Sequence, residues 1–245
     1  MMVSMWVSRL ADEFWQLAGD DRTFPRKLQP AIIRAFPLGV IALSGLRTDH
    51  VRRLLTRSHF PCPNVGPDRD LRGCLVAHND TGFVFLDADD PEAEQRFSLA
   101  HELAHFLRHY RQPRQEARRL LGEEALEALD GLRPPTTDER LTALLRHVPL
   151  RVHYHMMERN EGQRIVEPQT VKAEQEADEL AWELLAPVQE VHAQCEYTGN
   201  ADEPRNAVRK ALQLTFGLPA PQALAYTNHL LPEPPRDPLI ERLRK

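Results

Sequence analysis

Helices dominate the elements that the pattern of hydrophobic and polar positions predicts. Apolar residues recur three and four positions apart over 3–18, and the same spacing returns in shorter segments along the chain. The predicted helices are 3–18, 29–36, 48–57, 97–108, 116–130, 136–147, 171–187, 186–196, 203–216 and 219–231.

Short apolar runs predict three strands, at 37–43, 73–78 and 82–87. Asn79, Asp80 and Thr81 join the last two runs in the manner of a hairpin. A second hairpin is predicted within 148–166. The fold class that follows is α+β, mainly helical, with a small antiparallel or mixed β-sheet immediately before helix 97–108.

Helix 97–108 has a broad apolar arc and one narrow polar stripe. The stripe consists of Ser98, His101, Glu102, His105 and Arg108. A helix of this kind is largely buried and opens onto a cleft. Residues 101–105 read HELAH, so the two imidazoles lie one turn apart and can share one metal ion. We predict His101 and His105 as metal ligands and Glu102, on the flank, as the catalytic general base acting on a water.

A catalytic zinc site needs a third protein ligand and keeps its fourth position for water. The predicted helix 171–187 carries several carboxylates, and its apolar face separates them. Glu176, Glu179 and Glu183 fall opposite that face, whereas Glu174 and Asp178 fall on its edge, half buried. We predict Glu174 as the third ligand and Asp178 as the acceptor for the free ring N–H of a ligating histidine.

A family resemblance rests on these segments. The runs FSLAHELAHFLRH and EQEADELAWELLAP, with GFVFLDADD before them, resemble the ImmA/IrrE family of zinc metallopeptidases. The resemblance covers about residues 70–190 and implies a zincin-like domain, a gluzincin-like Zn²⁺ site and limited proteolysis of a partner helix-turn-helix repressor. The long stretch between His105 and Glu174 implies an insertion at 111–169.

Length and composition favour one domain. At 245 residues, 42% of them hydrophobic, the chain can bury one good core. We predict a single domain over 1–231, with N-terminal helices in 1–60, the motif core in 70–190 and a helical part in 191–231. The Pro-rich and charged segment 232–245 is predicted to be a tail.

Charge and cysteine content indicate which partners and which cellular compartment to expect. A net charge of −5 disfavours a nucleic-acid-binding surface, and the arginines of 108–119 alternate with Glu116, which is typical of a solvated helix face. Three cysteines without CxxC spacing favour a reducing compartment. The N-terminal segment does not have the pattern of a signal peptide and no run has the length of a membrane span, so we expect a cytoplasmic protein without membrane contact.

Further histidines are secondary candidates. His109 lies one more turn beyond His105, too far along a straight helix to bind the same ion, and is expected to be a neighbour of the site or a bystander. One of His147, His153, Tyr154 and His155 is a candidate to stabilise the oxyanion, and the sequence does not choose among them. The edge strand for an extended substrate is expected to be 73–78 or 82–87.

Two rival functions remain open at this stage. The first is a zinc endopeptidase acting on a protein or peptide. The second is a non-catalytic, zinc-stabilised module that binds a partner in a regulatory or toxin-antitoxin-like system. Glu102 favours the enzyme, because a module that needs only the metal has no use for a carboxylate there. A metal-free structural domain is a third hypothesis, which zinc analysis would test.

Overall fold

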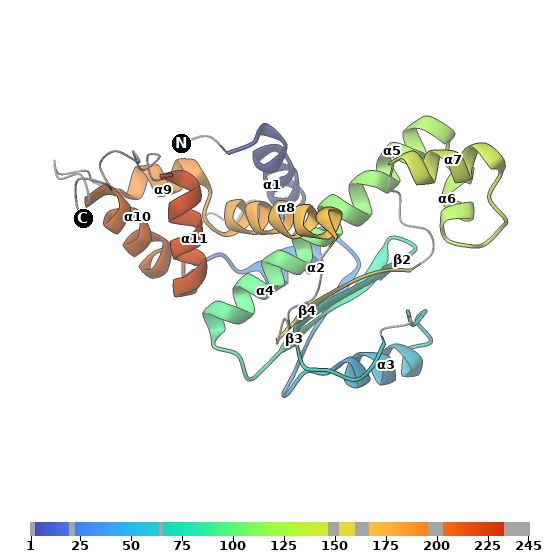
Figure 1. The fold of residues 1–245 in the computed structure, drawn as a ribbon, viewed down its shortest axis with the longest axis horizontal. Coiled ribbons are helices and arrows are strands. Elements are labelled where there is room, and N and C mark those ends of the chain that lie inside the picture. The colour runs from blue at the N-terminus through green and yellow to red at the C-terminus, as the bar shows by residue number, and fades with distance from the viewer. Residues whose placement is uncertain are drawn as a thin grey trace, which may run out of the picture.

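The computed structural model describes residues 3–19, 23–63, 66–146, 152–159, 167–195 and 203–232. The α+β prediction is confirmed: helices surround one four-stranded mixed sheet (Figure 1). The helices are α1 (Met5–Ala18), α2 (Leu28–Ala35), α3 (Thr48–Arg57), α4 (Glu92–His105), the π-helix η1 (Phe106–Arg111), α5 (Gln112–Leu121), α6 (Glu124–Leu129), α7 (Thr137–Arg146), α8 (Pro168–Leu185), α9 (Val188–Gln194), α10 (Glu203–Leu214) and α11 (Ala220–Leu230). The strands are β1 (Leu38–Leu43), β2 (Leu71–His78), β3 (Thr81–Asp87) and β4 (His153–Glu158).

The sheet has the order β1-β3-β2-β4. β3 runs parallel to β1 and antiparallel to β2, and β2 runs antiparallel to β4. The predicted hairpin is confirmed, and Asn79 and Asp80 have the positive φ angles, 49° and 57°, of a tight two-residue turn. The expectation of a substrate edge at 73–78 or 82–87 is wrong, because β2 and β3 both lie inside the sheet.

Helices cover both faces of the sheet, which explains why β2 is an almost continuous apolar run. Leu75 and Ala77 pack into the larger core with α1, α2, α4 and α8, whereas Cys74 and Val76 pack on the other face with α3. α8 lies across α4 on the outer side of this layer (Figure 1).

The outer helices differ in part from the sequence prediction. The single helix predicted at 116–130 is wrong: α5 ends before Gly122, which has a φ of 86°, and α6 begins at Glu124. α5, α6 and α7 form one end of the molecule and α9, α10 and α11 the other (Figure 1). Of the hairpin predicted within 148–166, β4 is described, whereas 148–151 and 160–166 lie outside the described residues, as does the tail beyond 232.

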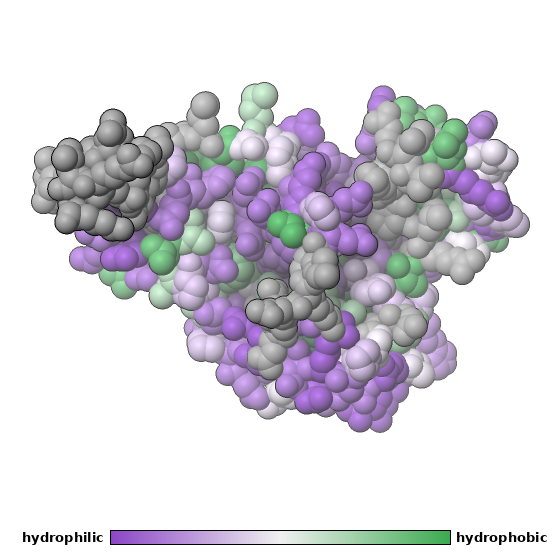
Figure 2. All heavy atoms as spheres, viewed as in Figure 1, coloured by the Kyte–Doolittle hydropathy of each residue, from purple (hydrophilic) through white to green (hydrophobic). Residues whose placement is uncertain are grey.

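The face of the molecule shown in Figure 2 is mostly hydrophilic, with hydrophobic residues in small separate patches. Among the described residues no helix combines the length and apolar character that crossing a bilayer requires.

Candidate metal centre

Four side chains from three elements meet beside the sheet. They are His101 and His105 of α4, His155 of β4 and Glu174 of α8. One ligand atom from each lies within 4.8 Å of all the others. The sequence therefore predicted correctly that His101, His105 and Glu174 come together, although about 70 residues separate the histidines from the glutamate.

The spacing of the donor atoms fits one small cation. His101 Nε2 lies 3.1 Å from His105 Nε2 and 3.2 Å from Glu174 Oε2, and His105 Nε2 lies 3.6 Å from Glu174 Oε1. A tetrahedral ion with ligands at about 2.0–2.1 Å separates its ligand atoms by about 3.3–3.4 Å. Two imidazoles and one carboxylate are also a donor set that such ions prefer, so these residues can hold a metal.

Glu102 lies beside this cluster and is fully buried. Its Oε2 lies 2.9 Å from His155 Nδ1, and its Oε1 has no hydrogen-bond partner among the described residues. A buried carboxylate oxygen without a partner is unfavourable unless another group meets it during function. Glu102 is therefore in place to accept a proton near the donor atoms.

Asp178 contacts His101 in the way the sequence predicted. Asp178 Oδ1 lies 2.9 Å from His101 Nδ1, the nitrogen that points away from the donor cluster. Burial alone lowers the pKa of His101, but the hydrogen bonds with Asp178 and Glu174 outweigh it and raise the pKa above its usual value. This contact fixes the ring orientation and leaves Nε2 for the cluster.

Glu174 is held as an anion by its histidine neighbours. Burial on its own raises the pKa of a carboxyl group, but hydrogen bonds from His101, His105 and His155 outweigh it and place the pKa of Glu174 far below its usual range. His105 has the opposite environment: burial and the neighbouring His155 lower its pKa well below the usual value, which favours the neutral ring that a metal requires.

His155 is the residue that sequence reasoning left undecided. Its ring stacks on that of His105, with centroids 3.6 Å apart, and its Nε2 lies 3.1 Å from Glu174 Oε1. Burial lowers the pKa of His155, but the carboxylates of Glu102 and Glu174 outweigh it and raise the pKa to about 10 without a metal. A bound cation opposes this protonation.

The other candidates of this segment are placed away from the cluster. Tyr154 is exposed, and His153 stacks near Tyr110, where burial lowers its pKa to about 3. His147 lies outside the described residues. Only alternation along β4 distinguishes His153 and His155 from Tyr154, and this signal was not usable until the register with β2 was known.

Two expectations about acids and arginines are wrong. Glu183 was expected opposite the apolar face of its helix but is 5% exposed, because its carboxylate accepts hydrogen bonds from Val188 N–H and from the hydroxyls of Tyr226 and Ser8. Arg114 is likewise not part of a solvated face: it is 2% exposed and paired with Asp130.

His109 lies outside the group of possible ligands but contacts it. The π-helix η1 begins directly after His105, and His109 Nδ1 lies 3.1 Å from His105 Nδ1. Burial lowers the pKa of His109, although Glu176 opposes this shift. The expectation of a neighbour rather than a ligand agrees with this position.

Comparison with known proteins matches this geometry to a family. Residues 33–129 match the family described as the IrrE N-terminal-like domain, peptidase M78. This range includes the sheet strands β1 to β3 and the helix with His101, Glu102 and His105, and it ends before His155 and Glu174. No curated protein matches the sequence. The resemblance noted from the motifs is confirmed for this part of the chain: residues 33–129 belong to a metallopeptidase domain of the ImmA/IrrE family.

Proposed function

We propose that the protein is a zinc-dependent endopeptidase that cuts a partner regulatory protein, such as a DNA-binding repressor, at a limited number of peptide bonds. The observation that supports this proposal most is Glu102, a buried carboxylate with one oxygen unpartnered among the described residues, held against a donor set for one cation. A module that only bound metal would gain nothing from this oxygen and would be destabilised by burying it.

His101, His105 and Glu174 would hold the zinc ion. A bound zinc ion supplies a Lewis acid that acidifies water and polarises a carbonyl group. Glu102 would take the proton of the attacking water on its carboxylate and pass it to the amine that leaves. His155 Nδ1, 2.9 Å from Glu102 Oε2, orients this carboxylate.

We place His155 beside the ion and not among its ligands. A catalytic zinc site has three protein ligands and keeps one coordination position for water, and His155 Nδ1 lies 2.9 Å from Oε2 of Glu102, the proposed base. From there His155 Nε2 would leave Glu174 Oε1 and donate a hydrogen bond to the oxyanion that forms on the substrate.

β4 supports an extended peptide as the substrate. β4 is an edge strand beside the cluster, paired with β2 on one side and with no described strand on the other. An extended peptide can pair with such an edge through its backbone, which places a peptide bond near the side chain of His155. We therefore propose β4 as the strand that pairs with the substrate, in place of the interior strands β2 and β3 that the sequence suggested.

The experiment compares the protein with its Glu102→Gln variant. Each is incubated with a candidate substrate, a purified small helix-turn-helix DNA-binding protein from the same genome, with zinc or with a chelator, and fragments are identified by mass spectrometry. We expect cleavage only by the zinc-loaded unsubstituted protein, together with an equal zinc content in both proteins. Glu179→Gln, on α8 but without a contact in the cluster, is the matched control and should cut normally.

The outcomes separate the rival functions. An intact repressor that binds both proteins equally would support the non-catalytic binding module. Cleavage by the Glu102→Gln variant at the unsubstituted rate would exclude the proposed role of Glu102. Loss of zinc from Glu176→Ala but not from Glu174→Ala would overturn the ligand assignment.

A further inference from the structure

His105 meets a second histidine on the nitrogen that faces away from the donor cluster. His105 Nε2 belongs to the cluster, 3.1 Å from His101 Nε2, whereas His105 Nδ1 lies 3.1 Å from His109 Nδ1. On its other side the His109 ring continues to a carboxylate, with Nε2 3.4 Å from Glu176 Oε2. The three side chains therefore form a continuous line from the cluster to α8.

The positions of the protons along this line follow from the chemistry of imidazole. A neutral ring has one N–H and one bare nitrogen. His105 Nε2 must be bare to bind a cation, so its proton is on Nδ1 and is donated to His109 Nδ1. The His109 proton is then on Nε2 and is donated to Glu176. Each step fixes the tautomer of the next ring.

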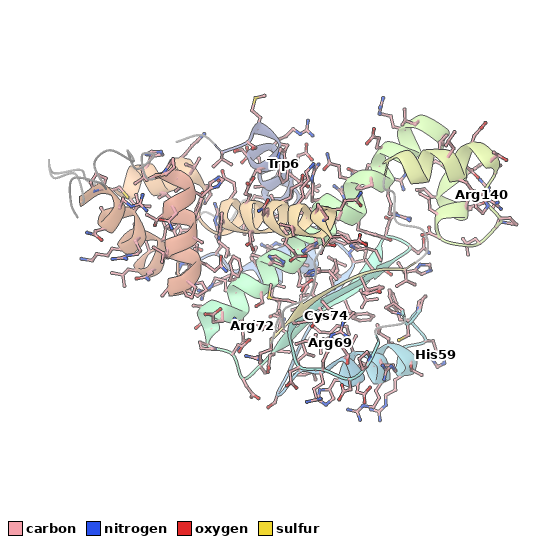
Figure 3. All side chains as sticks on the ribbon, in the orientation of Figure 1. Trp6, His59, Arg69, Arg72, Cys74 and Arg140 are labelled. Atoms are coloured by element: carbon pink, nitrogen blue, oxygen red, sulfur yellow. The ribbon has the colours of Figure 1, made fainter. Side chains whose placement is uncertain are left out.

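Glu176 is itself held in place. Arg108 donates to both of its oxygens, with Nε 2.8 Å from Oε2 and Nη2 3.3 Å from Oε1. The guanidinium of Arg108 in turn lies over the ring of Trp6, 4.4 Å from its centroid, and Figure 3 shows Trp6 on α1 next to α8. A carboxylate fixed in this way can hold the His109 ring in one orientation.

We propose that His109 and Glu176 are positioning residues for the metal centre: a hydrogen-bond relay that fixes the tautomer and ring orientation of His105 and raises its affinity for the ion. The inference rests on the proposed zinc site. The relay gives His105 the support that Asp178 gives His101 directly, at 2.9 Å from Nδ1. The two histidines of the HELAH motif thus depend on two different acids of α8.

The first test measures zinc affinity by competition with a chromophoric chelator. Removing a hydrogen-bond partner of a ligating histidine typically weakens metal binding about 10- to 100-fold. We expect a loss of this size for His109→Leu, which has no acceptor, and for Glu176→Ala. His109→Gln, whose amide oxygen can accept from His105 Nδ1, should recover most of the affinity. Glu179→Gln is the control that should bind zinc normally.

The second test needs no substitution and remains available if a variant does not fold. Long-range ¹H–¹⁵N NMR of the zinc-loaded protein reports which nitrogen of each histidine carries the proton. The relay requires the proton of His105 on Nδ1 and that of His109 on Nε2.

A proton on Nδ1 of His109, or equal zinc affinity for His109→Leu and the unsubstituted protein, would overturn the relay. Equal losses for His109→Leu and His109→Gln would assign the effect to packing instead. If the unsubstituted protein binds no zinc at all, the proposed function itself is contradicted. If it binds zinc and cuts its substrate, but the His109 and Glu176 variants have the same zinc affinity, only the relay is contradicted.

Discussion

At the scale of single residues, Gly73 leaves the space that the carboxylate of Glu102 occupies. A Cβ atom built on Gly73 would be 3.1 Å from Glu102 Oε1 and 3.3 Å from its Cγ, closer than most side-chain contacts in proteins. Glu102 is buried, so its side chain has little room to move aside. Nothing in the sequence marks this glycine, because its neighbour at position 102 is distant along the chain.

We predict that Gly73→Ala displaces Glu102 and lowers kcat by about tenfold or more, since small displacements of a catalytic group have large effects on rate. Zinc content and Tm should change little. Cys74→Ala is the matched control: Cys74, labelled in Figure 3, is on the same strand but packs on the α3 side, so its loss should affect stability and leave kcat unchanged. Equal kcat for Gly73→Ala and the unsubstituted protein would show that the carboxylate adapts.

His155 allows a separate test of the ligand assignment. If it lies beside the ion, His155→Ala should keep its zinc and lose most of its turnover, because a donor to the oxyanion contributes about 10²–10³ in rate. Zinc is measured by atomic spectroscopy on dialysed protein. A stoichiometric loss of zinc in His155→Ala would instead make His155 a ligand.

Glu183 predicts a pH dependence of stability outside the metal centre. Burial raises the pKa of its carboxyl group above the ordinary 4.5, although Val188 N–H and the hydroxyls of Tyr226 and Ser8 oppose the shift. The folded protein thus binds this proton more tightly than the unfolded chain, and the resulting stability is complete below pH 4.5 and is lost as the pH rises through the folded pKa.

Glu183→Gln cannot ionise, so the comparison isolates this group. The Tm of the unsubstituted protein relative to that of Glu183→Gln should fall as the pH rises above 4.5 and through the raised pKa of the folded state. Thermal unfolding followed by circular dichroism measures both. A difference in Tm that stays constant or rises over this range would contradict the assignment.

At the scale of elements, the sequence predicted site residues correctly where they lie on a helix whose hydrophobic periodicity is visible within the segment itself. The HELAH segment and the Glu174 helix are amphipathic, so their periodicity placed His101, Glu102, His105 and Glu174. β4 carries no such signal: HYHMME alternates weakly, and its place beside β2 is fixed by a pairing between distant segments. His155 therefore could not be chosen before the register was known, and the π-helix after His105 could not be distinguished from a continued α-helix.

The end formed by α5 and α6 depends on one buried ion pair. Arg114 Nη1 and Nη2 lie 2.8 and 3.0 Å from Asp130 Oδ1 and Oδ2, and Arg114 Nε lies 3.1 Å from Asp80 Oδ1 in the β2–β3 turn. Arg114→Met leaves Asp130 buried without its partner and should lower the free energy of unfolding by about 3–5 kcal/mol.

The double variant Arg114→Met/Asp130→Leu removes both charges and should recover most of this loss, since replacing a buried pair by apolar groups is often nearly neutral. Urea denaturation of the two single variants and the double variant gives the coupling energy. Additive losses in the double variant would mean that the pair is effectively solvated.

At the scale of the whole molecule, the side chains of the metal centre come from three separated parts of the chain: the ligands from α4 and α8, and His155 beside them from β4. The site exists only when the sheet, the central helix and the crossing helix are packed together. This arrangement accords with one domain over 1–231, which stays a prediction. It also means that metal binding and folding are linked, because the unfolded chain does not present these donors together.

Metal removal should therefore destabilise the protein as a whole. At a free zinc concentration of 100 Kd the ion adds about 2.7 kcal/mol to the free energy of unfolding, which corresponds to several degrees in Tm for a chain of this size. We expect a chelator to lower the Tm of the unsubstituted protein, and zinc to restore it. Glu174→Ala should show a much smaller response, because it lacks the one donor that α8 contributes to the cluster. A Tm that does not respond to chelator or zinc in the unsubstituted protein would mean that these side chains assemble without the ion, and the role of zinc in joining α4 and α8 would have to be abandoned.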